Sequence, residues 1–167
     1  MLQTNPGIAE LMARMIAYSA GNLHDIDHFI RVWTYAKTIG ELEGLDGETQ
    51  VILEFAAITH DIACPLCRVK YGNTNGKHQE AEGAVLVRDF LGGFDLPSAL
   101  VERVAWLVGH HHTFTDVRDL DHQILLEADY LANASENGWS KHKIRLFRDR
   151  FMHTESGNRL AQELFQL

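Results

Sequence analysis

Histidine and aspartate stand in this sequence at places where the surrounding pattern would otherwise carry apolar side chains. The pair His60-Asp61 ends the apolar segment EFAAITHDIA. His60 continues the apolar stripe of that segment and should face inward, while Asp61 lies about 100° further round the helix. A carboxylate in such a position costs free energy unless it is paired or binds a metal ion. Taken alone, however, such a pair is more often a capping aspartate beside a hydrogen-bonded core histidine.

A second carboxylate, Asp129, lies within the apolar segment HQILLEADYLANASE, one turn after Leu125 and beside the core-facing stripe. Aspartate is a poor helix former in mid-helix, so its position there needs a reason. One reason is metal binding; the other is a hydrogen bond from a serine or a backbone amide. His28 opens a further apolar stripe with Val32 and Ile39. A lone histidine of that kind is more often a core residue than a ligand.

The order of these residues resembles the H…HD…D motif of the HD superfamily of metal-dependent hydrolases. His28, the pair His60-Asp61 and Asp129 follow one another on three different expected helices. The segments IDHFIRVWTYAKTI, AAITHDIACP and LLEADYLAN are similar to the three motif regions, and the resemblance extends from about residue 24 to about residue 160. The segments KYGNTNGKHQEAEGA and FMHTESGNRLA resemble those of small stand-alone HD proteins.

This resemblance implies that His28, His60, Asp61 and Asp129 bind one metal ion within a helical bundle. Two imidazoles and two carboxylates suit Mn²⁺, Fe²⁺, Ni²⁺, Zn²⁺, Co²⁺ or Mg²⁺, and geometry decides among them. The implied activity is hydrolysis of a phosphate ester or anhydride of a small molecule, for example a nucleotide, by a water that the metal activates. Asp61 and His111 are the expected catalytic residues.

A second metal ion is also expected as an option. Relatives with two ions add histidines between the HD pair and the last aspartate, and the aspartate of the pair then bridges both ions. The candidates here are His78, His110 and His111. His111 continues an apolar stripe and should point inward, whereas His110 and His112 should point to either side of it. The run of three is equally typical of an exposed helix end, where histidine interacts well with the helix dipole.

Two basic residues could contact a substrate phosphate. Lys70 follows soon after the HD pair, and Arg31 lies one turn after His28. Arginine would bind phosphate with its planar fork and lysine as a point charge. Both are equally compatible with solvated surface cations.

The pattern of apolar residues predicts an all-α fold, a single-domain helical bundle over residues 1–167. The segment from Cys64 to Lys77 is rich in Gly, Asn and Pro and is expected to be an irregular loop. Apolar residues at helical spacing and turn-forming residues between them set the expected boundaries. Helices are expected at about residues 8–19, 25–42, 48–62, 78–91, 97–111, 122–136, 141–153 and 157–165.

The composition and net charge of the chain restrict the classes of partner that it can bind. The net charge is −8 and no lysine or arginine cluster is present, so a nucleic-acid polymer is not the expected partner. No apolar run reaches the length of a membrane span, and the N-terminus does not resemble a secretory signal. We expect a soluble cytoplasmic protein with a small phosphorylated substrate; a homodimer is one option for its oligomeric state. Cys64 and Cys67 form a CxxC pair without a second such pair, which favours reduced thiols.

Other functions remain compatible with these residues. A di-iron oxygenase on the same scaffold would need both additional histidines. A metal-containing sensor or binding domain would need no catalysis, but the complete H…HD…D set argues against it. A helical interaction protein would leave Asp129 unexplained at its core-facing place.

Overall fold

The computed structural model describes residues 7–167, which form nine α-helices and no strand. The predicted all-α class is therefore confirmed for this part of the chain. The helices are α1 Ile8–Tyr18, α2 Leu23–Leu42, α3 Gly47–Thr59, α4 Cys64–Tyr71, α5 Gly76–Leu91, α6 Ser98–Val108, α7 Leu120–Glu136, α8 Lys141–Phe151 and α9 Glu155–Phe165.

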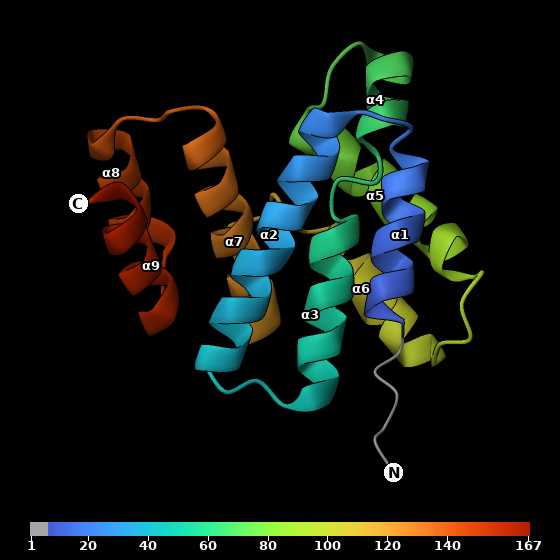
Figure 1. Ribbon diagram of the computed structural model, residues 1–167, viewed down its shortest axis with the longest axis horizontal. Coiled ribbons are helices and arrows are strands. Elements are labelled where there is room, and N and C mark those ends of the chain that lie inside the picture. The colour runs from blue at the N-terminus through green and yellow to red at the C-terminus, as the bar shows by residue number, and fades with distance from the viewer. Residues whose placement is uncertain (1–6) are drawn as a thin grey trace.

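Three helices form the centre of the bundle. The most extensive packing joins α2 to α7 and α2 to α3, and α3 also packs against α6 and α7 (Figure 1). Both α3 and α7 are covered on nearly every face, which explains why their apolar residues run almost continuously instead of in one stripe. Beyond α7 lie α8 and α9, while α4, α5 and α6 lie on the other side (Figure 1).

The helix boundaries follow from local hydrogen bonds. Asn22 caps α2 by accepting from the backbone N–H of Asp25, and Asp46 caps α3 by accepting from the N–H groups of Glu48 and Thr49. With its beginning fixed at this cap, α3 ends at Thr59. The pair His60-Asp61 follows directly after this helix.

The expected loop between Cys64 and Lys77 is wrong in its first half, which forms helix α4. Pro65 lies in the first turn of α4, where its missing N–H has no intrahelical partner to lose. Gly72 ends the helix with φ 69°, a conformation that glycine adopts without steric cost. Arg68 on α4 pairs with both carboxylate oxygens of Asp25 on α2, each at 2.7 Å, and so ties α4 to the beginning of α2.

The segment Gly47–Tyr71 contains both α3 and α4, and it is long and apolar enough to cross a membrane by length and composition alone. Within the fold, 78% of its most apolar window is buried. A core helix passes the same test, and the packing of α3 against α2, α6 and α7 accounts for its apolar character.

Candidate metal centre

Four side chains from three neighbouring helices converge in the centre of the bundle. His28 comes from α2, His60 and Asp61 follow α3, and Asp129 comes from α7. These are the same four residues that the motif resemblance singled out. They meet because α2, α3 and α7 pack directly against one another.

Nε2 of each imidazole lies close to one oxygen of each of the two carboxylates. Nε2 of His28 lies 3.1 Å from Oδ1 of Asp129, 3.2 Å from Nε2 of His60 and 3.3 Å from Oδ2 of Asp61. Nε2 of His60 lies 3.5 Å from the same two carboxylate oxygens. His60 is fully buried and His28 nearly so, while the side chain of Asp61 is 22% exposed. Asp61 is therefore the part of the group that solvent reaches most readily.

The two imidazoles are held with Nε2 toward the group. Nδ1 of His60 donates to the backbone oxygen of Ala57 at 2.7 Å, and Nδ1 of His28 donates to Oε2 of Glu136 at 2.8 Å. Because each ring uses Nδ1 as a donor, Nε2 is the nitrogen that can offer a lone pair to a metal ion. A carboxylate or carbonyl behind a ligating histidine is the usual way in which proteins fix the orientation of such a ring.

The imidazoles and carboxylates of this group shift one another's pKa values. Burial alone would lower the pKa of His28, but its hydrogen bond to Asp129 and the charges of Asp61 and Glu136 raise it to about 10. Burial alone would raise the pKa values of Asp61 and Asp129, but the imidazoles of His28 and His60 hold both below their ordinary range. Both carboxylates are therefore ionised at neutral pH.

The separations fit a divalent cation. Two ligands at right angles around an ion about 2.1 Å away lie about 3.0 Å apart, and two at the tetrahedral angle lie about 3.4 Å apart. The separations that involve Nε2 of His28 or His60 run from 3.1 to 3.5 Å, and the donor atoms of His28, His60 and Asp61 all lie within 4.8 Å of one another. Imidazole nitrogen and carboxylate oxygen are also the donor types that first-row divalent metals accept.

The comparisons with known proteins agree with this arrangement. The sequence model of the HD domain family matches residues 25–134. The chain belongs to the HD domain family. A comparison with curated proteins finds no match.

Solved structures share the HD fold. One is described as a predicted HD superfamily hydrolase from an uncultured Thermotogales bacterium; it is 22% identical, has a TM-score of 0.71, and the match covers 96% of this chain and 86% of that one. Another is the Lin1889 protein of Listeria innocua, which is 18% identical with a TM-score of 0.59 over 95% of this chain and 91% of that one. At these identities the likeness shows the fold alone.

A second group of donor atoms lies on the other side of the HD aspartate. Oδ1 of Asp61 lies 3.5 Å from Nε2 of His111, and the donor atoms of Asp61, His111 and His112 all lie within 4.8 Å of one another. Asp61 thus turns one oxygen toward His28 and the other toward His111. His111 is fully buried, as its apolar stripe indicated.

The pKa values of the two histidines of this second group are shifted in opposite directions. Burial alone would lower the pKa of His111, but Asp61 raises it. For His112, burial and the neighbouring charge of His111 lower the pKa to about 4. His112 is therefore neutral near pH 7 and keeps a lone pair available.

The structure does not bring the other two candidate ligands, His78 and His110, into either group. The ring of His78 stacks on Tyr71 with 3.8 Å between ring centroids. The ring of His110 stacks on Trp106 at 4.1 Å, and its Nδ1 donates to the backbone oxygen of Trp106.

The two basic candidates each have an acidic partner. Nη1 of Arg31 donates to Oε1 of Glu136 at 3.3 Å, so its fork lies behind His28. Lys70 on α4 donates to Glu82 on α5, and its side chain is 51% exposed. Glu136 was not singled out from the sequence, although it lies two helical turns after Asp129 and therefore on the same face of α7.

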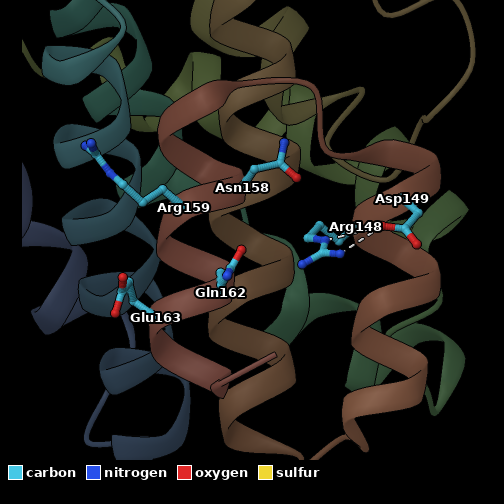
Figure 2. A pocket seen from close by; sticks show the side chains of 6 residues that line it. All are labelled: Arg148, Asp149, Asn158, Arg159, Gln162 and Glu163. Atoms are coloured by element: carbon cyan, nitrogen blue, oxygen red, sulfur yellow. Dashed lines mark hydrogen bonds and ion pairs between the residues drawn. The ribbon is translucent and has the colours of Figure 1, made fainter.

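Two further features of the fold belong to neither donor group. A groove of about 550 Å³ between α8 and α9 is lined by polar side chains, none of which belongs to either group (Figure 2). Arg148 pairs there with Asp149.

Cys64 and Cys67 are free and buried, and burial raises the pKa values of both thiols, which disfavours the reactive thiolate.

Proposed function

We propose that this HD protein is a metal-dependent phosphohydrolase that cleaves a phosphate ester or anhydride of a small molecule, with nucleotides among the candidates. One observation carries the proposal: Nε2 of His28 and Nε2 of His60 lie 3.2 Å apart, and each lies 3.1 to 3.5 Å from one oxygen of Asp61 and one oxygen of Asp129. Membership of the HD domain family supports it.

In this proposal the four residues hold one divalent ion, drawn from Mn²⁺, Fe²⁺, Ni²⁺, Zn²⁺, Co²⁺ or Mg²⁺. When bound, such an ion lowers the pKa of a water molecule and offsets negative charge on phosphoryl oxygens. Asp61, the most exposed of the four, lies where water and substrate would approach, and it is ionised and able to accept a hydrogen bond from the attacking water.

His111 is the proposed proton donor when one ion is bound. Its Nε2 lies 3.5 Å from Oδ1 of Asp61, and the contact with Asp61 raises the pKa of the ring, which favours its protonated form. A leaving alkoxide or phosphate oxygen beside Asp61 could take that proton. A general acid with a pKa near the working pH contributes most to such a step.

The proposed substrate is small and soluble. The side chain of Lys70 is half-exposed and could bind a phosphate with its charge. Arg31 donates a hydrogen bond to Glu136, so it could bind a phosphate only after that hydrogen bond breaks. The net charge of −8 disfavours nucleic acid and anionic membrane surfaces as partners. We propose that the activity is cytoplasmic. A homodimer is one option for the oligomeric state, and the molecular mass in solution measures it.

One observation favours a second candidate function. Asp61, His111 and His112 could hold a further ion, and two iron ions would make an oxygenase possible on this scaffold. Dioxygen consumption by the iron-loaded protein would support that function, and anaerobic turnover of a phosphorylated compound would exclude it.

The direct test is phosphate release from a panel of phosphorylated metabolites, with metal-depleted protein reloaded with each of the six metals. We expect turnover with at least one metal and none with Asp61→Ala, which should also bind less metal. Asp89→Ala, which removes an exposed aspartate on α5, is the matched control and should behave as wild type. Full activity in Asp61→Ala would overturn the proposal.

A further inference from the structure

Helix α8 carries a large share of the positive charge of this otherwise acidic chain. Its 11 residues hold five of the 15 lysines and arginines of the protein and one of its 23 acidic residues. The net charge of α8 is therefore +4, while that of the rest of the chain is −12. The expectation that the sequence contains no cluster of lysine or arginine is wrong for this helix, whose basic residues are Lys141, Lys143, Arg145, Arg148 and Arg150.

Most positive side chains outside α8 already have an acidic partner. Within residues 7–167, eight of the ten lysines and arginines outside α8 lie within 4.0 Å of a carboxylate oxygen, and the exceptions are Lys77 and Arg159. Within the same residues, Arg148 is the only cation of α8 with such a partner, and Figure 2 shows it beside Asp149. The other four positive charges of α8 are therefore not paired within the fold.

These four cations are exposed, and their local contacts leave their charge in place. The ammonium of Lys141 donates to the backbone oxygen of Gln166 at 2.8 Å. The ammonium of Lys143 lies over the ring of Trp139, 3.4 Å from its centroid. Neither a carbonyl group nor an aromatic ring carries a negative charge that could neutralise an ammonium.

A large apolar side chain lies among these charges. Leu146 is 59% exposed. Lys143 precedes it by three residues and Arg150 follows it by four, so the three side chains share one face of α8. A partner on this face would gain both ion pairs and the burial of apolar surface. We call the exposed set the basic patch, and it consists of Lys141, Lys143, Arg145, Leu146 and Arg150.

The apolar face of α8 is already used within the fold, which argues against a membrane as the partner. Ile144 is 1% exposed, and the ring of Phe147 stacks on Tyr130 of α7 with 3.3 Å between the ring centroids. Phe114, from the segment between α6 and α7, lies edge-on to Phe147. An amphipathic helix binds a membrane by burying its apolar face in the lipid. In α8 that face covers α7 instead.

The surroundings of the basic patch also argue against nucleic acid. Proteins bind single strands by stacking bases on open aromatic rings. Here Lys143 lies over Trp139, and Tyr130 stacks on Phe147. A duplex would extend beyond α8, which is about 16 Å long, and would meet the acidic remainder of the chain. A short anionic partner avoids that repulsion.

We propose that the basic patch of α8 binds a short acidic segment of another protein. Carboxylates of that segment pair with the four cations, and an apolar side chain of the segment packs on Leu146. Arginine suits this role because its planar fork binds a carboxylate with two parallel hydrogen bonds. The inference is independent of the proposed function, since no residue of α8 belongs to either donor group.

The test is fluorescence anisotropy of a labelled peptide of eight glutamates around one leucine, titrated with the full-length protein. We expect saturable binding whose Kd rises at least about tenfold between about 0.05 M and about 0.5 M salt, because salt screens exposed charges. Arg145→Glu and Arg150→Glu should each raise the Kd at least about fivefold. Lys77→Glu makes the same change of charge at an exposed lysine of α5, and its Kd should stay within about twofold of wild type.

A milder variant keeps the test decisive if a charge reversal prevents folding, which circular dichroism would reveal. Arg145→Gln removes one charge without adding another and should raise the Kd about two- to threefold. Leu146→Ser should weaken binding of the leucine-containing peptide at least about threefold and leave binding of a peptide of glutamates alone unchanged.

Other polyanions identify the class of partner. A uridine oligonucleotide with eight phosphates and vesicles that contain phosphatidylserine should both bind more weakly than the peptide. Tighter binding of either would overturn the choice of an acidic protein segment. Absence of peptide binding at low salt, or equal Kd values for wild type and both charge-reversal variants, would overturn the inference as a whole. Phosphate release plays no part in these measurements, so a failure of the proposed function would leave them unchanged.

Discussion

Nδ1 of His28 lies 2.8 Å from Oε2 of Glu136, across the interface between α2 and α7. The other nitrogen of the same ring lies 3.1 Å from Oδ1 of Asp129. His28 is thus held between two carboxylates of one helix, and the outer one fixes the direction in which the inner nitrogen points. Arg31 contacts the second oxygen of Glu136 and completes the arrangement.

The first prediction concerns this outer carboxylate. Glu136→Gln should weaken metal binding at the first site by about 10- to 100-fold, because carboxylates behind ligating histidines orient the ring and raise its basicity. Calorimetric titration of the metal-depleted variant measures the effect. Glu163→Gln, which changes an exposed glutamate on α9, should bind as wild type. Equal metal affinities for wild type and Glu136→Gln would show that Glu136 does not support metal binding.

The second prediction concerns metal removal. A ligand that binds only the native state stabilises it, by about 2.7 kcal/mol at a free concentration of 100 times Kd. For a chain of 167 residues this corresponds to a melting temperature about 5 to 10 °C higher. Chelation should therefore lower the melting temperature by that amount, and readdition of metal should restore it. A melting curve that stays the same while mass spectrometry shows the metal to be lost would contradict the prediction.

The third prediction follows from the pKa of His28, which is raised from its ordinary value of 6.5 to about 10. A raised pKa means that the protonated ring stabilises the metal-free fold fully below pH 6.5, and that this contribution is lost as pH rises toward 10. The free energy of unfolding of metal-free protein should fall over that range. Urea denaturation at several pH values, in the presence of chelator, measures it.

The same proton must leave when a metal ion binds Nε2 of His28. Metal binding near pH 7 should release about one proton from this ring, so that affinity rises up to about tenfold for each pH unit. Calorimetry in buffers of different ionisation enthalpy counts the protons. In His28→Ala the release from this ring should disappear, and an unchanged proton count in that variant would place the titrating group elsewhere.

The sequence predicted the larger features of the fold well because they depend on local patterns. Apolar spacing and capping residues such as Asp46 set helices close to their observed bounds. Helix α4 was not predicted, because Pro65 and Gly72 were interpreted as signs of a loop. Proline in the first turn of a helix and glycine just after its last turn are both compatible with a helix. The convergence of the four motif residues also agreed with expectation. His28, His60 and Asp129 lie on or beside the apolar stripes of their segments, whereas Asp61 follows the end of α3 and is the most exposed of the four.

The remaining parts of the site depend on contacts that no local pattern records. Neighbouring residues of a helix point about 100° apart, so whether His78 or Gln79 faces inward depends on how α5 packs. The structure turns Gln79 toward His111 and stacks His78 on Tyr71. The pairing of Glu136 with His28 joins residues 108 positions apart and arises only when α2 and α7 meet.

The last prediction separates stability from function at a second buried carboxylate of α7. Glu127 is fully buried, and its Oε1 accepts from Nε2 of Gln123 and the backbone N–H groups of His153 and Thr154 at 2.7 to 3.0 Å. Its other oxygen accepts from the hydroxyl of Thr154, which also caps α9. Glu127 therefore fastens the start of α9 to α7.

Removing this carboxylate should cost stability and leave the metal centre intact. Glu127→Ala strands several buried donors, and each such loss costs about 1 to 3 kcal/mol, so the free energy of unfolding should fall by at least about 3 kcal/mol. Gly157→Ala should act in the same direction, because its Cβ atom would overlap Oε2 of Glu127. Urea denaturation measures both losses, and Glu163→Gln serves as the control. Metal affinity of the folded fraction should match wild type; a loss of affinity as large as that of Glu136→Gln would show that the α7–α9 contact supports the metal centre directly.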